Sequence, residues 1–261
     1  MTPHYELAGP EGAEVVVLSN SLGTDLGLWD AQLPALAERF RVLRYDQRGH
    51  GRTPAAPGRY DLADLGGDVL ELLDHLDVER AHFAGVSLGG MTGMWLAEHA
   101  PQRLDRLALI CTSAELTPRQ AWRDRAAQAR RDGTASMVDG SLGRWFTPAL
   151  ATDPDVVARF GGALAACDDE GYASCAEAIA ELDLVDGLPR ITAPTLVIAG
   201  RDDPATPPPH AERIGAAVPG ARVEVLTDAS HLANVERAET VNRLLLHHFT
   251  RSLHESSHDA P

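Results

Sequence analysis

The chain has 261 residues, of which 44% are hydrophobic, so it is long enough to bury the core of one large α/β domain with an inserted subdomain. Its 38 acidic residues outnumber its 23 basic residues and give a net charge of −15. This charge argues against nucleic acid or an anionic membrane as a partner.

The first part of the chain alternates strands and helices. The β-branched run at residues 15–18 predicts a strand buried on both faces, and a loop of small residues follows at 19–24. The same reasoning predicts helices at 29–40 and 60–76, and strands at 41–45, 81–86 and 104–111. This alternation predicts a parallel, doubly wound sheet with right-handed crossovers.

The pattern then changes, because residues 113–190 contain no strand-like run. Helix-prone segments take the place of strands, at 118–132, 136–146, 154–166 and 172–182. We therefore expect a helical lid at 113–190, inserted into a core made of residues 1–112 and 191–261. The core resumes with strands at 194–200 and 222–226 and helices at 209–218 and 237–249, and the polar tail at 255–261 is expected to be disordered.

A candidate nucleophile lies where the strand at 81–86 ends. Gly85-Val86-Ser87-Leu88-Gly89 matches the nucleophile elbow G-x-S-x-G, a sharp turn between strand and helix. Such a turn strains the backbone of Ser87 and requires glycine on both sides. A plain Gly/Ser turn is the alternative, since average composition produces the motif by chance in roughly one chain in ten. The motif therefore needs a matching acid and histidine.

Both partners occur in the order that such elbows require, which is serine, acid, histidine. Asp203 is the favoured acid because it follows a predicted strand as Gly-x-x-Asp, and Asp202 is the alternative. Either aspartate could instead cap a local turn. His231 lies between the last strand and the closing helix, where the base belongs, whereas His50 precedes Ser87 in the chain.

An oxyanion hole needs two backbone N–H groups. We expect one from Leu88, directly after the nucleophile, and the other from Leu22 in the loop at 19–24. In that loop Asn20 and Ser21 either brace the backbone or cap it. The segment Arg48-Gly49-His50-Gly51 is expected to be a salt-bridged turn that supports the neighbouring loops.

Taken together, these motifs identify a resemblance to the α/β-hydrolase superfamily over essentially the whole chain. The elbow, Tyr45-Asp46-x-Arg48-Gly49-His50-Gly51, Gly200-x-x-Asp203 and His231 follow one another in the expected order. More narrowly, the chain looks like the β-ketoadipate enol-lactonases. That likeness rests on residues 19–25 with Trp29-Asp30, on 144–148 and on 199–207.

The resemblance implies hydrolysis of 3-oxoadipate enol-lactone to 3-oxoadipate in aromatic catabolism, through a Ser-His-Asp triad and an acyl-enzyme, without a cofactor or metal. This substrate is an anionic lactone with a free carboxylate, so a cation should line the pocket. Arg144 is the candidate, with Trp145 as a wall of the site and Asn20 as a further substrate contact. A solvated lid arginine is the alternative for Arg144.

Several rivals share the same triad, which therefore cannot separate them. They are a carboxylesterase, a cofactor-free haloperoxidase or perhydrolase, and a C–C bond hydrolase. A dehalogenase or an epoxide hydrolase is excluded, because each needs a carboxylate where this chain has Ser87. A non-catalytic ligand-binding protein on the same scaffold is the rival of a different class, although no triad member is missing.

The remaining features predict where the protein works. The three cysteines, Cys111, Cys167 and Cys175, lack metal-ligand spacing and indicate reduced thiols. The first residues lack the basic and apolar regions of a signal peptide, and no apolar run reaches membrane-spanning length. We expect a cytoplasmic protein with no membrane partner. Whether it forms a homo-oligomer is left open.

Overall fold

The computed structural model describes residues 2–250, so the predicted disorder at 255–261 lies outside the described residues. Seven strands form one sheet in the order β1-β3-β2-β4-β5-β6-β7. All neighbouring pairs are parallel except β1 and β3, which are antiparallel. The strands are Tyr5–Ala8 (β1), Val15–Ser19 (β2), Arg41–Tyr45 (β3), Ala81–Val86 (β4), Leu104–Ile110 (β5), Thr195–Gly200 (β6) and Arg222–Leu226 (β7). The predicted fold class, a mostly parallel and doubly wound sheet, is confirmed.

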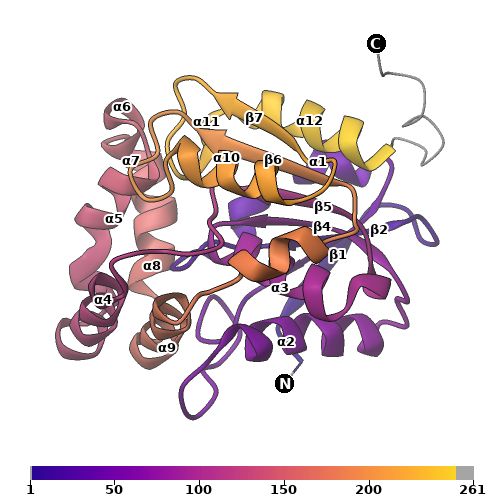
Figure 1. Ribbon diagram of the computed structural model, residues 1–261. Coiled ribbons are helices and arrows are strands. Elements are labelled where there is room, and N and C mark those ends of the chain that lie inside the picture. The colour runs from indigo at the N-terminus through magenta and orange to yellow at the C-terminus, as the bar shows by residue number, and fades with distance from the viewer. Residues whose placement is uncertain (1, 251–261) are drawn as a thin grey trace.

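Helices cover both faces of the sheet (Figure 1). One face carries α1 (Leu33–Ala37) and α12 (Ala238–Thr250), which touch each other and pack on β3 and β5 respectively. The opposite face carries α2 (Leu62–His75), α3 (Leu88–His99), α10 (Pro208–Ala217) and the 3₁₀ helix η5 (Val185–Arg190). The short elements η1 (Leu26–Trp29), η2 (Pro101–Arg103) and α11 (Ala233–Glu236) connect these layers.

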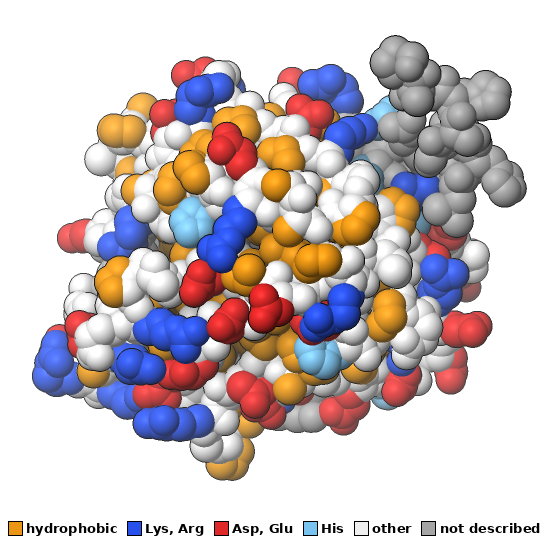
Figure 2. All heavy atoms as spheres, in the orientation of Figure 1, with side chains coloured by type: hydrophobic (Ala, Val, Ile, Leu, Met, Phe, Trp, Pro, Cys, Tyr) orange, Lys and Arg blue, Asp and Glu red, His pale blue; other side chains and the backbone are white. Residues whose placement is uncertain are grey.

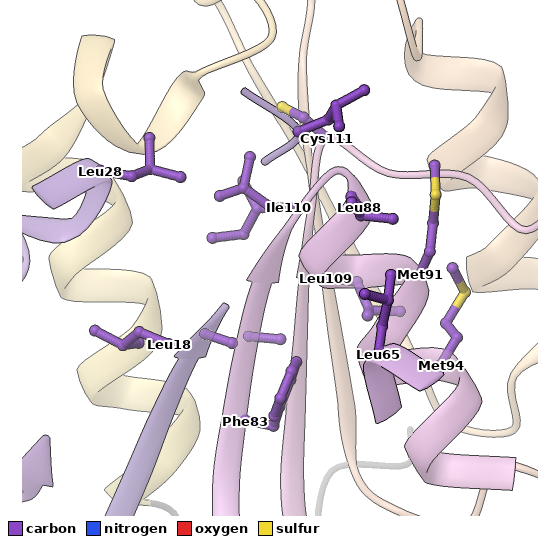
Figure 3. Packing of buried hydrophobic residues seen from close by; sticks show 14 of the residues in the cluster. Leu18, Leu28, Leu65, Phe83, Leu88, Met91, Met94, Leu109, Ile110 and Cys111 are labelled. Atoms are coloured by element: carbon purple, nitrogen blue, oxygen red, sulfur yellow. The ribbon is translucent and has the colours of Figure 1, made fainter. Parts of the chain in front are cut away.

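The central strands are buried on both sides, which explains their continuous apolar runs. Leu18, Phe83 and Ile110 come from three adjacent strands and have no exposed surface, and Leu88 and Met91 of α3 pack over the same core (Figure 3). This packing fixes the carboxyl ends of β2 and β4, from which the loops of the site emerge. Between residues 2 and 250, no helix has the length and apolar character that crossing a bilayer would need.

The chain between β5 and β6 is helical and gathers at one end of the sheet, on the left of Figure 1. We call this segment the cap. On the face shown in Figure 2, basic and acidic side chains mingle over α4 and α9, where Arg130 pairs with Glu170 and Glu177. The cap elements before η5 are α4 (Arg119–Asp132), η3 (Thr134–Met137), α5 (Val138–Trp145), α6 (Pro148–Ala151), α7 (Pro154–Val156), the π-helix η4 (Val157–Gly161), α8 (Gly162–Ala165) and α9 (Asp169–Ala180).

Two local predictions are wrong, and one strand was missed. The helix expected at 29–40 is two elements, because Asp25 caps a separate 3₁₀ turn and Pro34 then starts α1. The helix expected at 154–166 is interrupted by the π-helix η4, which ends at the Gly161-Gly162 pair. Strand β1 was not expected, since four half-buried edge residues give too short an alternation to recognise.

Candidate active site

The elbow has the strained geometry that its sequence requires. Ser87 lies between β4 and α3 and has φ of 54° and ψ of −113°, a backbone conformation that residues with a side chain rarely adopt. A Cβ on Gly85 would lie 2.2 Å from the carbonyl carbon of Gly89, and one on Gly89 would lie 2.3 Å from the carbonyl oxygen of Ser19. Only glycine fits at either position, so the sequence of the turn follows from its packing.

Asp203 and His231 form a buried pair. The Nδ1 of His231 lies 2.8 Å from Oδ2 of Asp203, which also accepts the Thr206 hydroxyl at 2.7 Å. The other carboxylate oxygen accepts the N–H groups of Ala205 and Thr206. Burial alone would raise the pKa of Asp203, but His231 and Thr206 together hold it below its usual value. Asp202 is exposed, so of the two candidate acids only Asp203 reaches the histidine.

The two expected oxyanion donors lie on either side of one hydrogen bond. The Gly89 N–H donates to the carbonyl oxygen of Asn20 at 2.9 Å and so ties the loop after β2 to the first turn of α3. Within residues 2–250, neither the Leu22 N–H nor the Leu88 N–H donates to a protein acceptor. Two free N–H groups in neighbouring segments are what an oxyanion hole requires.

His50 supports the loop at residues 19–24, which contains Leu22. Its Nε2 accepts the Gly23 N–H at 2.9 Å, and its Nδ1 lies 3.1 Å from the carbonyl oxygen of Arg48. Nδ1 therefore carries the proton, and burial lowers the pKa of His50, which keeps the ring neutral. The Arg48 guanidinium in turn makes a bidentate pair with Asp68 at 2.7 and 2.6 Å. The predicted supporting turn at 48–51 is confirmed.

The structure does not bring Asn20 to the cavity as the expected substrate contact. Its side chain is fully buried, and its amide nitrogen donates to the carbonyl oxygen of Tyr45 at 2.7 Å. The neighbouring Ser19 hydroxyl bonds to the Tyr45 hydroxyl. Asn20 therefore braces the loop, which is the alternative that the sequence left open, and Ser21 faces the cavity instead.

A cavity of about 200 Å³ opens between the elbow and the cap. Four predicted side chains meet there: Ser87, His231, Arg144 and Trp145. Sequence reasoning missed Arg125, although Ala121, Trp122 and Arg125 share one helix face, as a spacing of three to four residues would indicate. The lining residues are Ser21, Leu22, Ser87, Ala121, Trp122, Arg125, Arg144, Trp145, Ala205 and His231.

Two arginines give this cavity an uncompensated positive charge. Arg125 and Arg144 donate to the same Ser141 hydroxyl, at 3.1 and 3.2 Å, and Arg125 also donates to the Tyr172 hydroxyl. Within the described part of the chain, neither guanidinium pairs with a carboxylate. Burial and the nearby charge of Arg125 lower the pKa of Arg144. An anionic ligand would relieve this repulsion.

Comparisons with known proteins identify the family of this chain. The alpha/beta hydrolase fold family matches residues 14–238. The chain is 40% identical to 3-oxoadipate enol-lactonase 2 of Acinetobacter baylyi, over 92% of this chain and 90% of that one. It is 35% identical to a protein of Stutzerimonas stutzeri named as a carbamate hydrolase, RutD, over 94% of this chain and 96% of that one. The enol-lactonase from Burkholderia xenovorans LB400 is 43% identical in sequence. Its crystal structure superposes with a TM-score of 0.92 over 95% of this chain and 96% of that one.

Proposed function

This chain belongs to the alpha/beta hydrolase family and is a hydrolase, and on that premise we propose that it hydrolyses 3-oxoadipate enol-lactone to 3-oxoadipate. Such a reaction would place it in the β-ketoadipate pathway. The observation that carries the proposal is the pair of unneutralised arginines in the cavity that also contains Ser87 and His231. The likeness to two enol-lactonases supports it.

In the first half of the reaction, the Ser87 oxygen attacks the lactone carbonyl carbon while His231 accepts the serine proton on Nε2. Asp203, bonded to Nδ1, holds the ring in the tautomer that leaves Nε2 free. The N–H groups of Leu22 and Leu88 stabilise the oxyanion. The bond between the acyl carbon and the ring oxygen then breaks. The enolate oxygen, which stays part of the acyl chain on Ser87, takes the proton from His231, and the resulting enol tautomerises to the ketone.

The second half restores the enzyme. His231 removes a proton from water, which attacks the acyl carbon on Ser87, and the same N–H groups stabilise the second oxyanion. The bond between the acyl carbon and the Ser87 oxygen breaks, and the serine recovers its proton from His231. The product leaves as a dicarboxylate, so the reaction consumes one water and needs no cofactor.

The substrate carboxylate, which takes no part in bond making, would bind Arg125 and Arg144. Trp122 and Trp145 line the same cavity and would form apolar walls beside this ion pair. A hydrogen bond between charged groups contributes about 1.5–3 kcal/mol. Removing one guanidinium should therefore raise KM for the anionic lactone roughly 10- to 150-fold, since about 1.4 kcal/mol corresponds to a factor of ten.

The test is the loss of ultraviolet absorbance of the enol-lactone, run beside hydrolysis of the neutral ester p-nitrophenyl acetate. Wild type should act on both, and Ser87→Ala on neither. Arg125→Met and Arg144→Met should raise KM for the lactone while changing KM for the ester much less. Arg123→Met is the matched control, because this cap arginine is exposed and already paired with Glu181. Equal effects of the two cavity variants on both substrates would refute the assigned role.

The carbamate hydrolase relative supplies the second candidate, and general esterases share the same triad. A higher kcat/KM for a carbamate or a neutral ester than for the lactone would favour one of these. A fluorophosphonate that fails to label Ser87 would favour a non-catalytic ligand-binding protein.

A further inference from the structure

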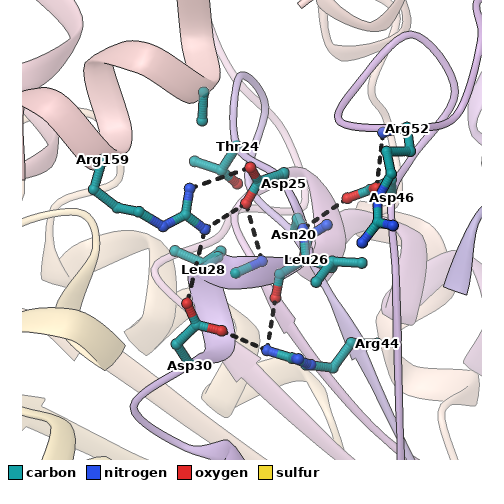
Figure 4. A network of polar contacts seen from close by, with 12 residues as sticks. Asn20, Thr24, Asp25, Leu26, Leu28, Asp30, Arg44, Asp46, Arg52 and Arg159 are labelled. Carbon is teal, nitrogen blue, oxygen red and sulfur yellow. Dashed lines mark hydrogen bonds and ion pairs between the residues drawn. The ribbon is translucent and has the colours of Figure 1, made fainter. Parts of the chain in front are cut away.

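Another arginine of the cap, Arg159, reaches the core beside the loop at residues 19–24, which we call the oxyanion loop (Figure 4). It lies in the π-helix η4, and π-helical turns are frequent at functional sites. Its two terminal nitrogens lie 2.7 and 3.2 Å from the two carboxylate oxygens of Asp25, in a bidentate pair. A weaker contact of 3.9 Å reaches Asp30. The ion pair therefore joins the cap to the segment that follows β2.

The surface under Arg159 is shaped to receive it. A Cβ on Gly27 would lie 1.7 Å from the Nη2 atom of Arg159, so any other residue would push the guanidinium away. The backbone of Gly27 is not left-handed, so its lack of a side chain serves close packing: the same Cβ would also lie 3.1 Å from Oδ1 of Asp25. The Arg159 and Asp25 side chains are 38% and 26% exposed, and pairs with such exposure add little to the free energy of folding. A role besides stability would explain the fit.

Asp25 holds one end of the oxyanion loop. Its carboxylate accepts the Gly27 N–H at 2.9 Å and caps η1. The preceding residue, Thr24, donates both its N–H and its hydroxyl to the carbonyl oxygen of Ser21. Leu22 therefore sits inside a closed turn, one end of which is anchored at Asn20 and the other at Asp25.

The cap also rests directly on this turn. A Cβ on Gly23 would lie 2.8 Å from Leu164, 3.2 Å from Tyr172 and 3.3 Å from Trp145, which are all cap residues. A shift of the cap would therefore be transmitted to Gly23 and to the adjacent Leu22 N–H. The bidentate pair at Asp25 opposes such a shift, because a planar guanidinium fixes both distance and direction.

We propose that Arg159 is a positioning residue: through Asp25 it holds the cap and the oxyanion loop in register, so that the Leu22 N–H meets the developing oxyanion. This inference rests on the proposed acyl-transfer function. A misplaced donor affects the transition state and leaves ground-state binding nearly unchanged. Loss of the pair should therefore lower kcat while KM stays almost constant.

The test uses two independent ways to break the pair. Arg159→Ala removes the guanidinium, whereas Gly27→Ala keeps every charge but displaces it. Each should lower kcat for p-nitrophenyl acetate about tenfold, a fraction of the roughly 10²- to 10³-fold loss when an oxyanion donor is removed, and should slow fluorophosphonate labelling of Ser87 to the same extent. Arg159→Lys should recover part of the rate.

Arg52→Ala is the matched control, because Arg52 lies near this site, where its backbone N–H donates to Asp46 (Figure 4), whereas within residues 2–250 its exposed guanidinium bonds to Glu6 alone. It should leave kcat unchanged. Unchanged kcat in Arg159→Ala or Gly27→Ala, or equal changes in kcat and KM, would overturn the inference while wild-type activity stands. A wild type that hydrolyses no ester or lactone and resists labelling would instead overturn the proposed function and the inference with it.

Discussion

Replacement of Glu236 by glutamine tests how the loop of His231 is held against the cap. Glu236 ends α11, and its carboxylate accepts three hydrogen bonds: from the Ser230 N–H at 2.5 Å, the Thr147 N–H at 2.8 Å and the Thr147 hydroxyl at 2.7 Å. Ser230 immediately precedes His231, and Thr147 lies two residues after Trp145. Within residues 2–250, no arginine or histidine forms an ion pair with Glu236.

The expected loss of stability in Glu236→Gln follows from the geometry of these hydrogen bonds. Glutamine keeps the shape but turns one acceptor oxygen into an NH₂ donor. Whichever way the amide turns, at least one backbone N–H then faces a donor. A buried donor without a partner costs about 1–3 kcal/mol. For a chain of this size 1 kcal/mol corresponds to a fall in Tm of roughly 2–4 °C, so a loss of about 2 kcal/mol should lower Tm by roughly 4–8 °C.

The assay is thermal unfolding together with steady-state kinetics on the enol-lactone. Glu236→Gln should lower Tm and raise KM, because the loop of His231 and the segment that carries Arg144 are no longer held together. Glu239→Gln is the matched control, since it makes the same charge change on the exposed side of the next helix. A Tm for Glu236→Gln within 1 °C of the control would contradict this reasoning.

Three further predictions concern the triad and the elbow. Asp203→Asn should lower kcat by roughly 10⁴-fold, as in other serine triads, whereas exposed Asp202→Asn should lose less than twofold; the reverse order would reassign the acid. The folded state depresses the pKa of Asp203, so its contribution to stability is present above the unfolded pKa of about 3.9 and is lost as pH falls through the folded pKa. The difference in unfolding free energy between wild type and Asp203→Asn should therefore shrink in urea titrations taken from pH 6 to pH 3, and a constant difference would count against this linkage. Gly89→Ala should abolish soluble expression or labelling of Ser87, because its Cβ would lie 2.3 Å from the carbonyl oxygen of Ser19.

The parts of the fold that sequence predicts well are those where one physical constraint dominates. Parallel strands covered on both faces must be apolar throughout, so Val15–Ser19 and Ala81–Val86 are evident, and the tight turn at Ser87 demands its glycines. Edge strand β1 is half exposed and carries no such constraint. The break between η1 and α1 depends on a single aspartate cap and a proline, which periodicity does not register.

Side-chain direction was harder to predict than chain position. Asn20 stands in the oxyanion loop, yet its amide turns inward to Tyr45 because a buried carbonyl there needs a donor. Arg125 lies on an arginine-rich helix where most guanidinium groups are exposed. Only packing across Tyr172 and Ser141 shows that this one enters the cavity. Such choices depend on partners distant in sequence.

The insertion point of the cap has a consequence for how this hydrolase can change. The Leu184 N–H donates to the carbonyl oxygen of Ala114 at 2.9 Å, so the helical part of the cap leaves and re-enters the core at nearly the same place. A segment with such close ends can lengthen or shorten at little entropic cost. Ser87 and His231 come from the core, whereas the arginines of the cavity come from the cap. Substrate preference can therefore change by exchange of the cap while the proposed acyl-transfer chemistry of the core is inherited unchanged.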